Sequence, residues 1–480
     1  MLTARIFERA RQRPDQLALI FDGIHLSYDQ FARLIDGACR RLAPLELPTV
    51  KTAVLCINSL LDVWVAGLAL RSLGATTMAV RTFDDIAGVA PDLGCLVMDS
   101  AEVSQSARET AKAAGWRLVE LRAGDFNGGE VPPAAGSETA IAGGHIVLTS
   151  GTTGSYKKVL IDPASELANI PRRSALFGVS EHSLVNLFDF GGWTSAGYNM
   201  AVCAWGVGGA VAISQGDARF RRLPWASFTH SELHPEILRD LLAAGEPASP
   251  NPDMALIVIS GSLSRALWEE ARQRLTPKIF TCVSSTETGP FTVTAIETAE
   301  DLRWHRAHPS RRVEIVDEAN QPVPPGVLGR LRIHIEDNIR GYLGDLETSA
   351  HFFRDGCFHP GDLAVFRPDG RFALQGRTTD VINVLGAKIA TAPIEEALRD
   401  ELGVKGVCLF SVQGADGGEE LHIAIEGGAD IDPQLLSAAI RARLHGFDQA
   451  HIHFVAALPR SPAGKIQRGA VRAAVMGGGG

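Results

Sequence analysis

Short runs of consecutive apolar residues alternate along this chain with longer amphipathic segments. Six runs have the character of buried strands: AVLCIN (53–58), TTMAV (76–80), CLVMD (95–99), HIVLTS (145–150), ALIVIS (255–260) and KIFTCVS (278–284). Helical patterns lie between them, through Leu70, over about 102–114 and over 263–275. Continuous apolar runs are typical of strands that are buried on both faces of a parallel sheet. The pattern therefore predicts a layered α/β fold.

The pattern changes at about Arg312, where polar and apolar residues begin to alternate around Pro and Gly turns. This alternation is typical of antiparallel strands and predicts a β-barrel-like part within a large multi-subdomain N-terminal domain. A compact segment with β, α and β patterns follows and predicts a small α+β domain. We expect the large domain over 1–378, the small domain over 379–476 and a flexible glycine tail over 477–480.

Length, charge and cysteine content narrow the class of protein. A chain of 480 residues is long enough for about three structural units. The net charge of −9 offers no electrostatic reason to expect a nucleic-acid partner. The seven cysteines are scattered, so no CxxC motif is present, and they favour reduced thiols in a cytoplasmic protein. The most apolar long stretch, Val63 to Val80, is interrupted by Arg71, so we expect no membrane insertion.

The first candidate for chemistry is a loop directly after the run HIVL. Hydroxyl residues, glycines and a lysine interleave in it: Thr149, Ser150, Gly151, Thr152, Thr153, Gly154 and Lys157. Glycine lets the backbone approach an anion, hydroxyls and N–H groups donate to phosphate oxygens, and lysine adds a positive charge. The spacing does not match GxxxxGK[ST], so this is not a Walker A loop. The alternative interpretation is a flexible Ser/Gly linker.

This loop resembles the signature loop of the adenylate-forming superfamily, which contains acyl-CoA synthetases, adenylation domains of peptide synthetases and luciferases. By that resemblance it holds the β- and γ-phosphates of ATP. Tyr156 stands where the family has proline, and Lys158 stands where it has glycine.

The segment SSTETG (284–289) resembles a second motif of the same family. The resemblance implies that Glu287 ligates Mg²⁺ and that Thr286 contacts the α-phosphate. A carboxylate is a suitable ligand because Mg²⁺ prefers hard oxygen donors. Val283 occupies the place of the family's adenine-stacking aromatic residue, and Ser284 the place of its glycine.

Further motifs follow in the family's order. By resemblance, Asp362 accepts hydrogen bonds from the ribose hydroxyls, and Arg377 contacts the ribose or a phosphate. The resemblance also places Thr379 at the hinge, where the family has Asp. The same resemblance implies that Gly386 lines the thiol or CoA channel and that Lys465 is the catalytic lysine. The small domain then swings about the hinge between adenylation and thioester formation.

The resemblance implies ATP- and Mg²⁺-dependent activation of a small carboxylic acid, with coenzyme A as the thiol acceptor. The segment LFDFGGW (187–193) resembles that of acyl-CoA synthetases, which favours an acyl acid over an amino acid. Trp193, Gly261, Ser262 and Ser284 are the candidate acyl pocket, although Trp193 also fits an ordinary core position. Two alternatives stay open: transfer to the phosphopantetheine of an acyl or peptidyl carrier protein, and a non-catalytic nucleotide- or acyl-binding protein.

Overall fold

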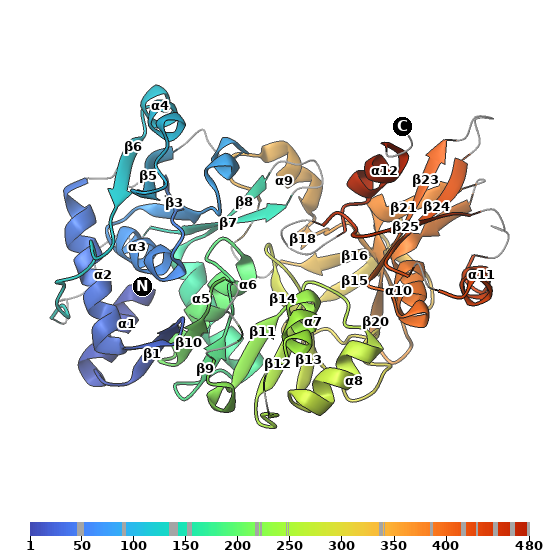
Figure 1. Cartoon of the computed structure of the whole chain (residues 1–480), viewed down its shortest axis with the longest axis horizontal. Helices are drawn as coiled ribbons and strands as arrows, with labels where there is room; N and C mark the ends of the chain where they lie inside the picture. The colour runs from blue at the N-terminus through green and yellow to red at the C-terminus, as the bar shows by residue number, and fades with distance from the viewer. Residues whose placement is uncertain are drawn as a thin grey trace.

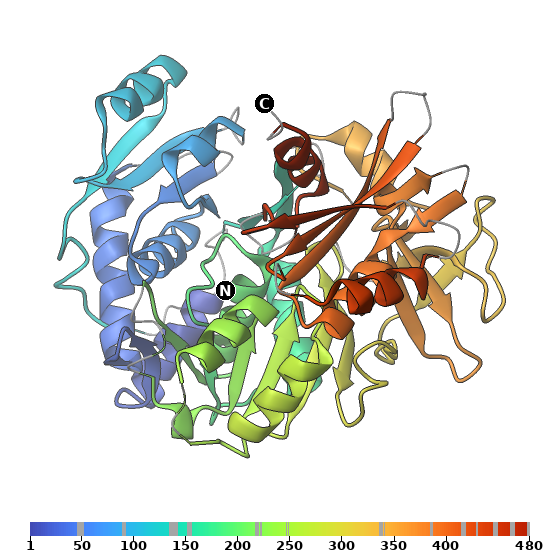
Figure 2. The ribbon, with the colours of Figure 1, turned by 45° about the vertical axis from the view of Figure 1, so that its right-hand side comes forward.

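The chain is arranged as two large sheets followed by an antiparallel sheet and a smaller C-terminal part. The computed structural model describes residues 1–45, 52–88, 93–133, 143–150, 156–216, 220, 223–245, 247, 249–335, 339, 341–384, 387–413, 419–428, 431–444, 450–460 and 466–477. Figure 1 shows the N-terminal elements on the left and the C-terminal strands on the right. Figure 2 brings the C-terminal part to the front.

The largest sheet has eight strands in the order β14-β13-β12-β11-β9-β10-β1-β2. Its inner pairings, from β13 to β1, are parallel, and the two edge pairings are antiparallel. The strands are β1 (Leu17–Phe21), β2 (Ile24–Ser27), β9 (Leu184–Asn186), β10 (Ala210–Ile213), β11 (His230–Leu233), β12 (Ala255–Ile259), β13 (Ile279–Ser285) and β14 (Gly289–Ala295). The apolar runs at 255–260 and 278–284 form buried parallel strands, as their composition predicted, and the structure pairs the two strands with each other.

A second sheet has six strands in the order β6-β5-β3-β4-β7-β8, parallel except for the β7–β8 pair. Its strands are β3 (Thr52–Cys56), β4 (Thr76–Ala79), β5 (Leu93–Asp99), β6 (Arg117–Leu121), β7 (His145–Ser150) and β8 (Tyr156–Ile161). The helices of this half are α1 (Leu2–Gln12), α2 (Tyr28–Leu42), α3 (Leu60–Ser72), α4 (Gln105–Ala114), α5 (Pro163–Phe177), α6 (Ser195–Gly206), α7 (Pro235–Ala243) and α8 (Arg265–Arg274). In Figure 1, α3, α5 and α6 lie between the two sheets.

A buried polar network joins the helices between these sheets. Arg71 of α3 forms an ion pair of 2.8 Å with Glu166 of α5. Tyr198 of α6 donates to Glu166 and accepts a hydrogen bond of 2.5 Å from Arg71. The ring of His145 on β7 stacks on Tyr198 with centroids 4.0 Å apart. A buried ion pair needs such additional hydrogen bonds, because desolvation of the two charges is costly.

The segment after Arg312 forms an antiparallel sheet in the order β17-β18-β16-β19-β20, with β15 pairing with β16. Its strands are β15 (Val313–Val316), β16 (Gly329–His334), β17 (Phe353–Arg354), β18 (Cys357–Phe358), β19 (Asp362–Phe366) and β20 (Phe372–Arg377), with the helix α9 (Leu346–Phe352). The antiparallel pairing agrees with the alternating sequence. The sheet is open rather than a closed barrel, since no pairing among the described residues joins β17 to β20.

The C-terminal part begins with a short 3-10 turn over Thr378–Asp380. Its elements are β21 (Val381–Val384), β22 (Ala387–Ala390), α10 (Thr391–Leu402), β23 (Gly406–Gln413), β24 (Glu419–Glu426), α11 (Pro433–Arg441), β25 (His451–Val455) and α12 (Arg468–Gly477). Two apolar clusters consist only of residues from this part. Among the described residues, no helix has the length and apolar character that a membrane span requires.

Candidate active site

The carboxyl ends of four parallel strands, β9, β11, β12 and β13, meet at one edge of the eight-stranded sheet. In open α/β sheets, ligands bind outside this edge. Two residues just beyond these strands have a left-handed backbone: Phe188 after β9, with a φ of 49°, and Ser260 after β12, with a φ of 59°. Such conformations are costly for residues other than glycine and persist where surrounding structure imposes them. The strain marks this edge as a candidate site.

Three segments come together at this edge. The ring of Phe190 lies 4.7 Å from that of His234, which directly follows β11. Nδ1 of His234 lies 3.3 Å from the backbone oxygen of Ile259 at the end of β12. Gly191 is required beside Trp193, because a Cβ atom there would lie 2.3 Å from the tryptophan ring.

Of the four residues predicted to line an acyl pocket, Trp193, Gly261 and Ser262 lie on loops that follow these strands, and Ser284 lies near the end of β13. Trp193 is half-buried and packs against the main core. Gly261, Ser262 and Ser284 are exposed at the ends of the paired strands β12 and β13. Their role in binding an acid remains a prediction.

Glu287 lies in the tight turn between β13 and β14. The hydroxyls of Ser285 and Thr288 are 2.9 Å apart, and the Thr288 N–H donates to the Ser285 hydroxyl at 3.1 Å. These contacts shape the turn that carries Thr286, which is half-buried, and Glu287, which is buried. Oε1 of Glu287 accepts a hydrogen bond of 2.7 Å from the hydroxyl of Tyr342. The carboxylate is thereby held in one orientation.

Lys157 on β8 approaches the same place from the second sheet. Its Nζ lies 3.6 Å from the ring centroid of Phe352 and 5.0 Å from that of Tyr342. Burial lowers the pKa of Lys157, the charge of Glu287 raises it and the charge of Arg377 lowers it. Lys157 and Glu287 therefore both lie against the side chain of Tyr342.

Asp362 and Arg377 are direct partners in the antiparallel pairing of β19 with β20. Nε of Arg377 lies 3.3 Å from Oδ1 of Asp362. Thr149, on β7, is opposite Lys157 in the β7–β8 pair. The structure therefore brings residues from the predicted phosphate and metal motifs together at Tyr342, and it pairs the predicted ribose residues Asp362 and Arg377 with each other.

Six predicted site residues lie outside the described part of the chain: Gly151, Thr152, Thr153, Gly154, Gly386 and Lys465. Ser150 and Thr379 are placed only as part of β7 and of the turn over Thr378–Asp380. Arg460 and Ile466 are the described residues on either side of the segment 461–465, which contains Lys465. They form an isolated β-bridge with each other. Arg460 pairs with Glu426 at 2.7 Å and with Glu236 of α7 at 3.7 Å. Arg460 is thus held between Glu426 of β24 and Glu236 of α7.

Sequence reasoning missed Tyr342 and His234. The position of His234 directly after a buried strand is a signal that could have selected it, because the carboxyl ends of parallel strands form sites. No local pattern distinguishes Tyr342, which is 55 residues from Glu287.

Comparison with known proteins agrees with the family resemblance of the sequence motifs. The family model described as AMP-binding enzyme matches residues 6–343. A component of the linear gramicidin synthase of Brevibacillus parabrevis is 24% identical over 496 residues, which cover 97% of this chain and 10% of that protein. This chain therefore spans about a tenth of that relative.

Solved structures share the fold. The amide bond synthetase McbA of Marinactinospora thermotolerans has a TM-score of 0.81 and 20% identity, with 98% of this chain and 99% of that one covered. The o-succinylbenzoate CoA synthetase of Bacillus subtilis, solved with its acyl-adenylate intermediate, has a TM-score of 0.80 and 18% identity, with 97% of both chains covered. The same synthetase solved with ATP and a magnesium ion has a TM-score of 0.81. With a family model that matches most of its length, this chain belongs to the AMP-binding enzyme family.

Proposed function

We propose that this protein uses ATP and Mg²⁺ to convert a carboxylic acid into an acyl-adenylate, releases pyrophosphate, and transfers the acyl group to the thiol of coenzyme A. The observation that carries the proposal is that Lys157, from the second sheet, and Glu287, just beyond β13, both lie against Tyr342, while Asp362 and Arg377 pair with each other. Family membership supports it, and so do relatives solved with ATP and magnesium and with an acyl-adenylate.

The residues present fit a magnesium–nucleotide complex. Glu287 offers a buried carboxylate that Tyr342 orients, and Mg²⁺ prefers such hard oxygen donors shared with phosphates. When bound, the metal supplies positive charge for the phosphate oxygens. Lys157 adds a second cation, and Thr286 offers a hydroxyl near the α-phosphate. Asp362 provides acceptors for the ribose hydroxyls, while Arg377 contacts the ribose or a phosphate.

The central difficulty of the reaction is that a carboxylate must attack an anionic phosphate. Fixed cations that surround the phosphates lower this barrier, because they stabilise the charge that develops on the leaving group. We propose that Lys465 is the cation that acts on the transferring group and that the loop from Thr149 to Lys157 holds the pyrophosphate. The pairing of Arg460 with Glu236 supports this role, since Arg460, which precedes Lys465 by five residues in the sequence, lies beside α7.

The division into a large domain over 1–378 and a small mobile domain over 379–476 belongs to the same proposal. Thr379 lies in the turn that joins the two parts. Rotation at this turn would withdraw Lys465 after adenylation and bring the segment of Gly386 toward the acyl-adenylate. The thiol then attacks the acyl carbon and AMP leaves.

The acceptor is the part of the proposal that the relatives support least, because they include a CoA synthetase, an amide bond synthetase and a component of a gramicidin synthase. We propose coenzyme A, since the segment 187–193 resembles acyl-CoA synthetases. Loading of a carrier-protein phosphopantetheine is the alternative. Saturation of product formation by free CoA supports the first, and saturation only by a holo-carrier protein supports the second.

The proposed activity is tested by acid-dependent ATP–pyrophosphate exchange with short, medium, aromatic and amino acids. We expect Lys465→Ala to lower exchange at least about tenfold, which corresponds to about 1.4 kcal/mol of transition-state stabilisation. Lys405→Ala is the matched control, because Lys405 is an exposed lysine of the same C-terminal part. Exchange that is unchanged in Lys465→Ala would refute the role of this lysine. No exchange with any acid would count against the function.

A further inference from the structure

A second group of side chains with metal-binding chemistry lies in the C-terminal part. Glu420 and His422 are two residues apart on β24, so they project from the same face of the sheet. His451 on β25 is the direct partner of His422 in the parallel β24–β25 pair. His453, two residues along β25, projects from that face as well. The pairing therefore collects one carboxylate and three imidazoles on one face.

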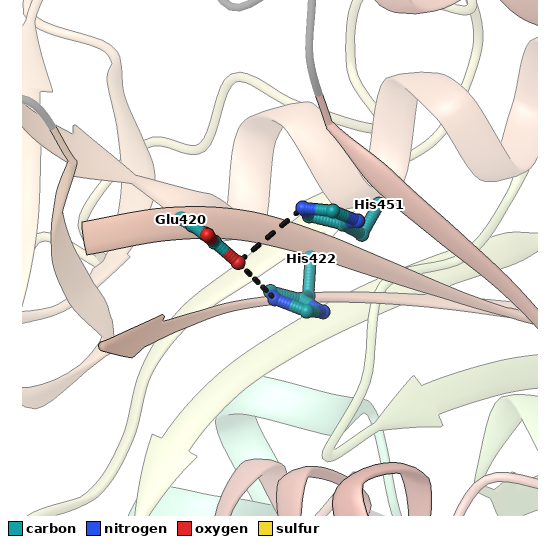
Figure 3. Close-up of side chains that lie close together, drawn as sticks. All are labelled: Glu420, His422 and His451. Atoms are coloured by element: carbon teal, nitrogen blue, oxygen red, sulfur yellow. Dashed lines mark ion pairs between the residues drawn. The ribbon is translucent and has the colours of Figure 1, made fainter. Parts of the chain in front are cut away.

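Nitrogens of His422 and His451 both approach one oxygen of Glu420 (Figure 3). Nε2 of His451 lies 3.3 Å from Oε2 of Glu420, and Nε2 of His422 lies 3.7 Å from the same oxygen. One ligand atom from each residue lies within 4.8 Å of the other two. Bonds of about 2.0–2.1 Å in a tetrahedral zinc site place ligand atoms about 3.3–3.4 Å apart. The rings of His422 and His451 stack with centroids 4.6 Å apart, so rotation of these side chains would turn both ring nitrogens toward one ion and reach this geometry.

The buried Nε2 of His422 is an independent observation that points to a ligand at this place. Its side chain is only 5% exposed, and its Nε2 has no hydrogen-bond partner among the described residues. The other nitrogen, Nδ1, is hydrogen-bonded to Nε2 of His453 at 2.9 Å. If His422 donates in that bond, Nε2 presents a lone pair toward a carboxylate. If Nε2 carries the proton instead, Glu420 is too distant to accept it. Either neutral tautomer leaves this buried nitrogen without a hydrogen bond, and the tautomer protonated at Nδ1 offers the Nε2 lone pair to a cation that lies among the three side chains.

The outer partners suit a metal ligand. Metal-bound histidines usually donate their other ring N–H to an acceptor, which fixes the ring and the tautomer. His453 provides that acceptor for His422, and Phe410 stacks on the ring of His422 with centroids 5.3 Å apart. The ligands nearer the solvent, Glu420 and His451, have side chains 44% and 52% exposed. They leave the site open to an entering ion and to water as a further ligand.

We propose that Glu420, His422 and His451 bind one divalent cation of the zinc class, with His453 as the positioning residue of His422. Two imidazole nitrogens and one carboxylate oxygen are donors that suit Zn²⁺ better than Mg²⁺, which prefers oxygen ligands alone. The ion would join β24 to β25 and would therefore stabilise the folded C-terminal part. This site is separate from Glu287 and does not depend on the proposed adenylating activity.

The test is a zinc titration of the full chain, without an affinity tag of histidines, after treatment with a chelator and in the absence of nucleotide. Competition with a chromophoric chelator measures the affinity. We expect one equivalent of Zn²⁺ to bind, and we expect the midpoint of thermal unfolding to rise with Zn²⁺, because the ion binds the folded state. His451→Gln and Glu420→Gln are expected to weaken binding at least tenfold. His453→Phe is expected to weaken it about tenfold to hundredfold, as loss of an outer partner does.

His182→Gln is the matched control, since His182 is an exposed histidine beside a carboxylate in another part of the chain. Its Nε2 lies 3.7 Å from Oε1 of Glu181. It is expected to bind Zn²⁺ as the parent does. His451 and Glu420 are exposed, so their variants are expected to keep the metal-free unfolding midpoint. Absence of saturable binding to the parent would overturn the proposal. Binding of equal affinity in His451→Gln and Glu420→Gln would overturn it as well, because the zinc would then occupy other ligands.

Discussion

Removal of the Tyr342 hydroxyl is the sharpest test of how the candidate metal site is held. Tyr342 donates to Oε1 of Glu287 at 2.7 Å, and both residues are buried. Burial, followed by the charge of Glu287, raises the pKa of Tyr342, so the phenol is a protonated donor at neutral pH. Tyr342→Phe deletes this donor. It retains the ring, which packs against Phe353 and lies near Lys157.

Two independent estimates give the size of the effect. A hydrogen bond to a charged group contributes about 1.5–3 kcal/mol. Loss of a partner that orients a metal ligand weakens metal affinity or activity about tenfold to hundredfold, which corresponds to about 1.4–2.8 kcal/mol. We therefore expect Tyr342→Phe to lower kcat/KM for MgATP about tenfold to hundredfold. The KM for the acid is expected to stay unchanged, because the deleted hydroxyl bonds to the proposed metal ligand and not to a residue of the candidate acyl pocket.

The measurement is acid-dependent ATP–pyrophosphate exchange as a function of MgATP concentration. Tyr28→Phe is the matched control, since the buried hydroxyl of Tyr28 donates to the Gly209 backbone oxygen at 2.6 Å, away from Glu287. The same atom is deleted there, and exchange is expected to match the parent. If folded Tyr342→Phe had a kcat/KM within twofold of the parent, Tyr342 would not orient a metal ligand. The role assigned to Glu287 would then lose its geometric support.

The remaining predictions concern stability. Glu166→Gln is expected to lower the free energy of unfolding in urea by about 3–5 kcal/mol, because it leaves the buried Arg71 unpaired. Glu120→Gln, which breaks the exposed pair with Arg108, is expected to cost less than about 1 kcal/mol, and equal losses would contradict this reasoning. Burial lowers the pKa of His305 from 6.5 to about 4, so between these pH values the unfolded state binds more protons and stability falls as the pH falls. His305→Gln is expected to reduce this slope by up to about 1.4 kcal/mol per pH unit, and an unchanged slope in pH-dependent urea unfolding would show that His305 does not titrate in this window.

The sequence alone determined the fold class and the candidates for the site. Apolar runs such as 255–260 and 278–284 predicted buried parallel strands, because a strand covered on both faces does not alternate between polar and apolar residues. The turn around Glu287 and the pair of Asp362 and Arg377 were selected from local motifs, whose residues are close in the chain or follow a recognisable strand. These features are local, so short stretches of sequence encode them.

Only the tertiary structure decided which distant side chains meet. Tyr342 reaches Glu287 across 55 residues, and Arg71 finds its partner Glu166 between two sheets. The spacing of Glu420 and His422 places both on one face of a strand, but the parallel register of β24 with β25 is what brings His451 beside them. The physical reason is that a residue's local neighbours set its secondary structure, whereas its distant partners depend on how whole strands and helices pack to bury apolar surface. A polar side chain carries little information about that packing in its own part of the sequence.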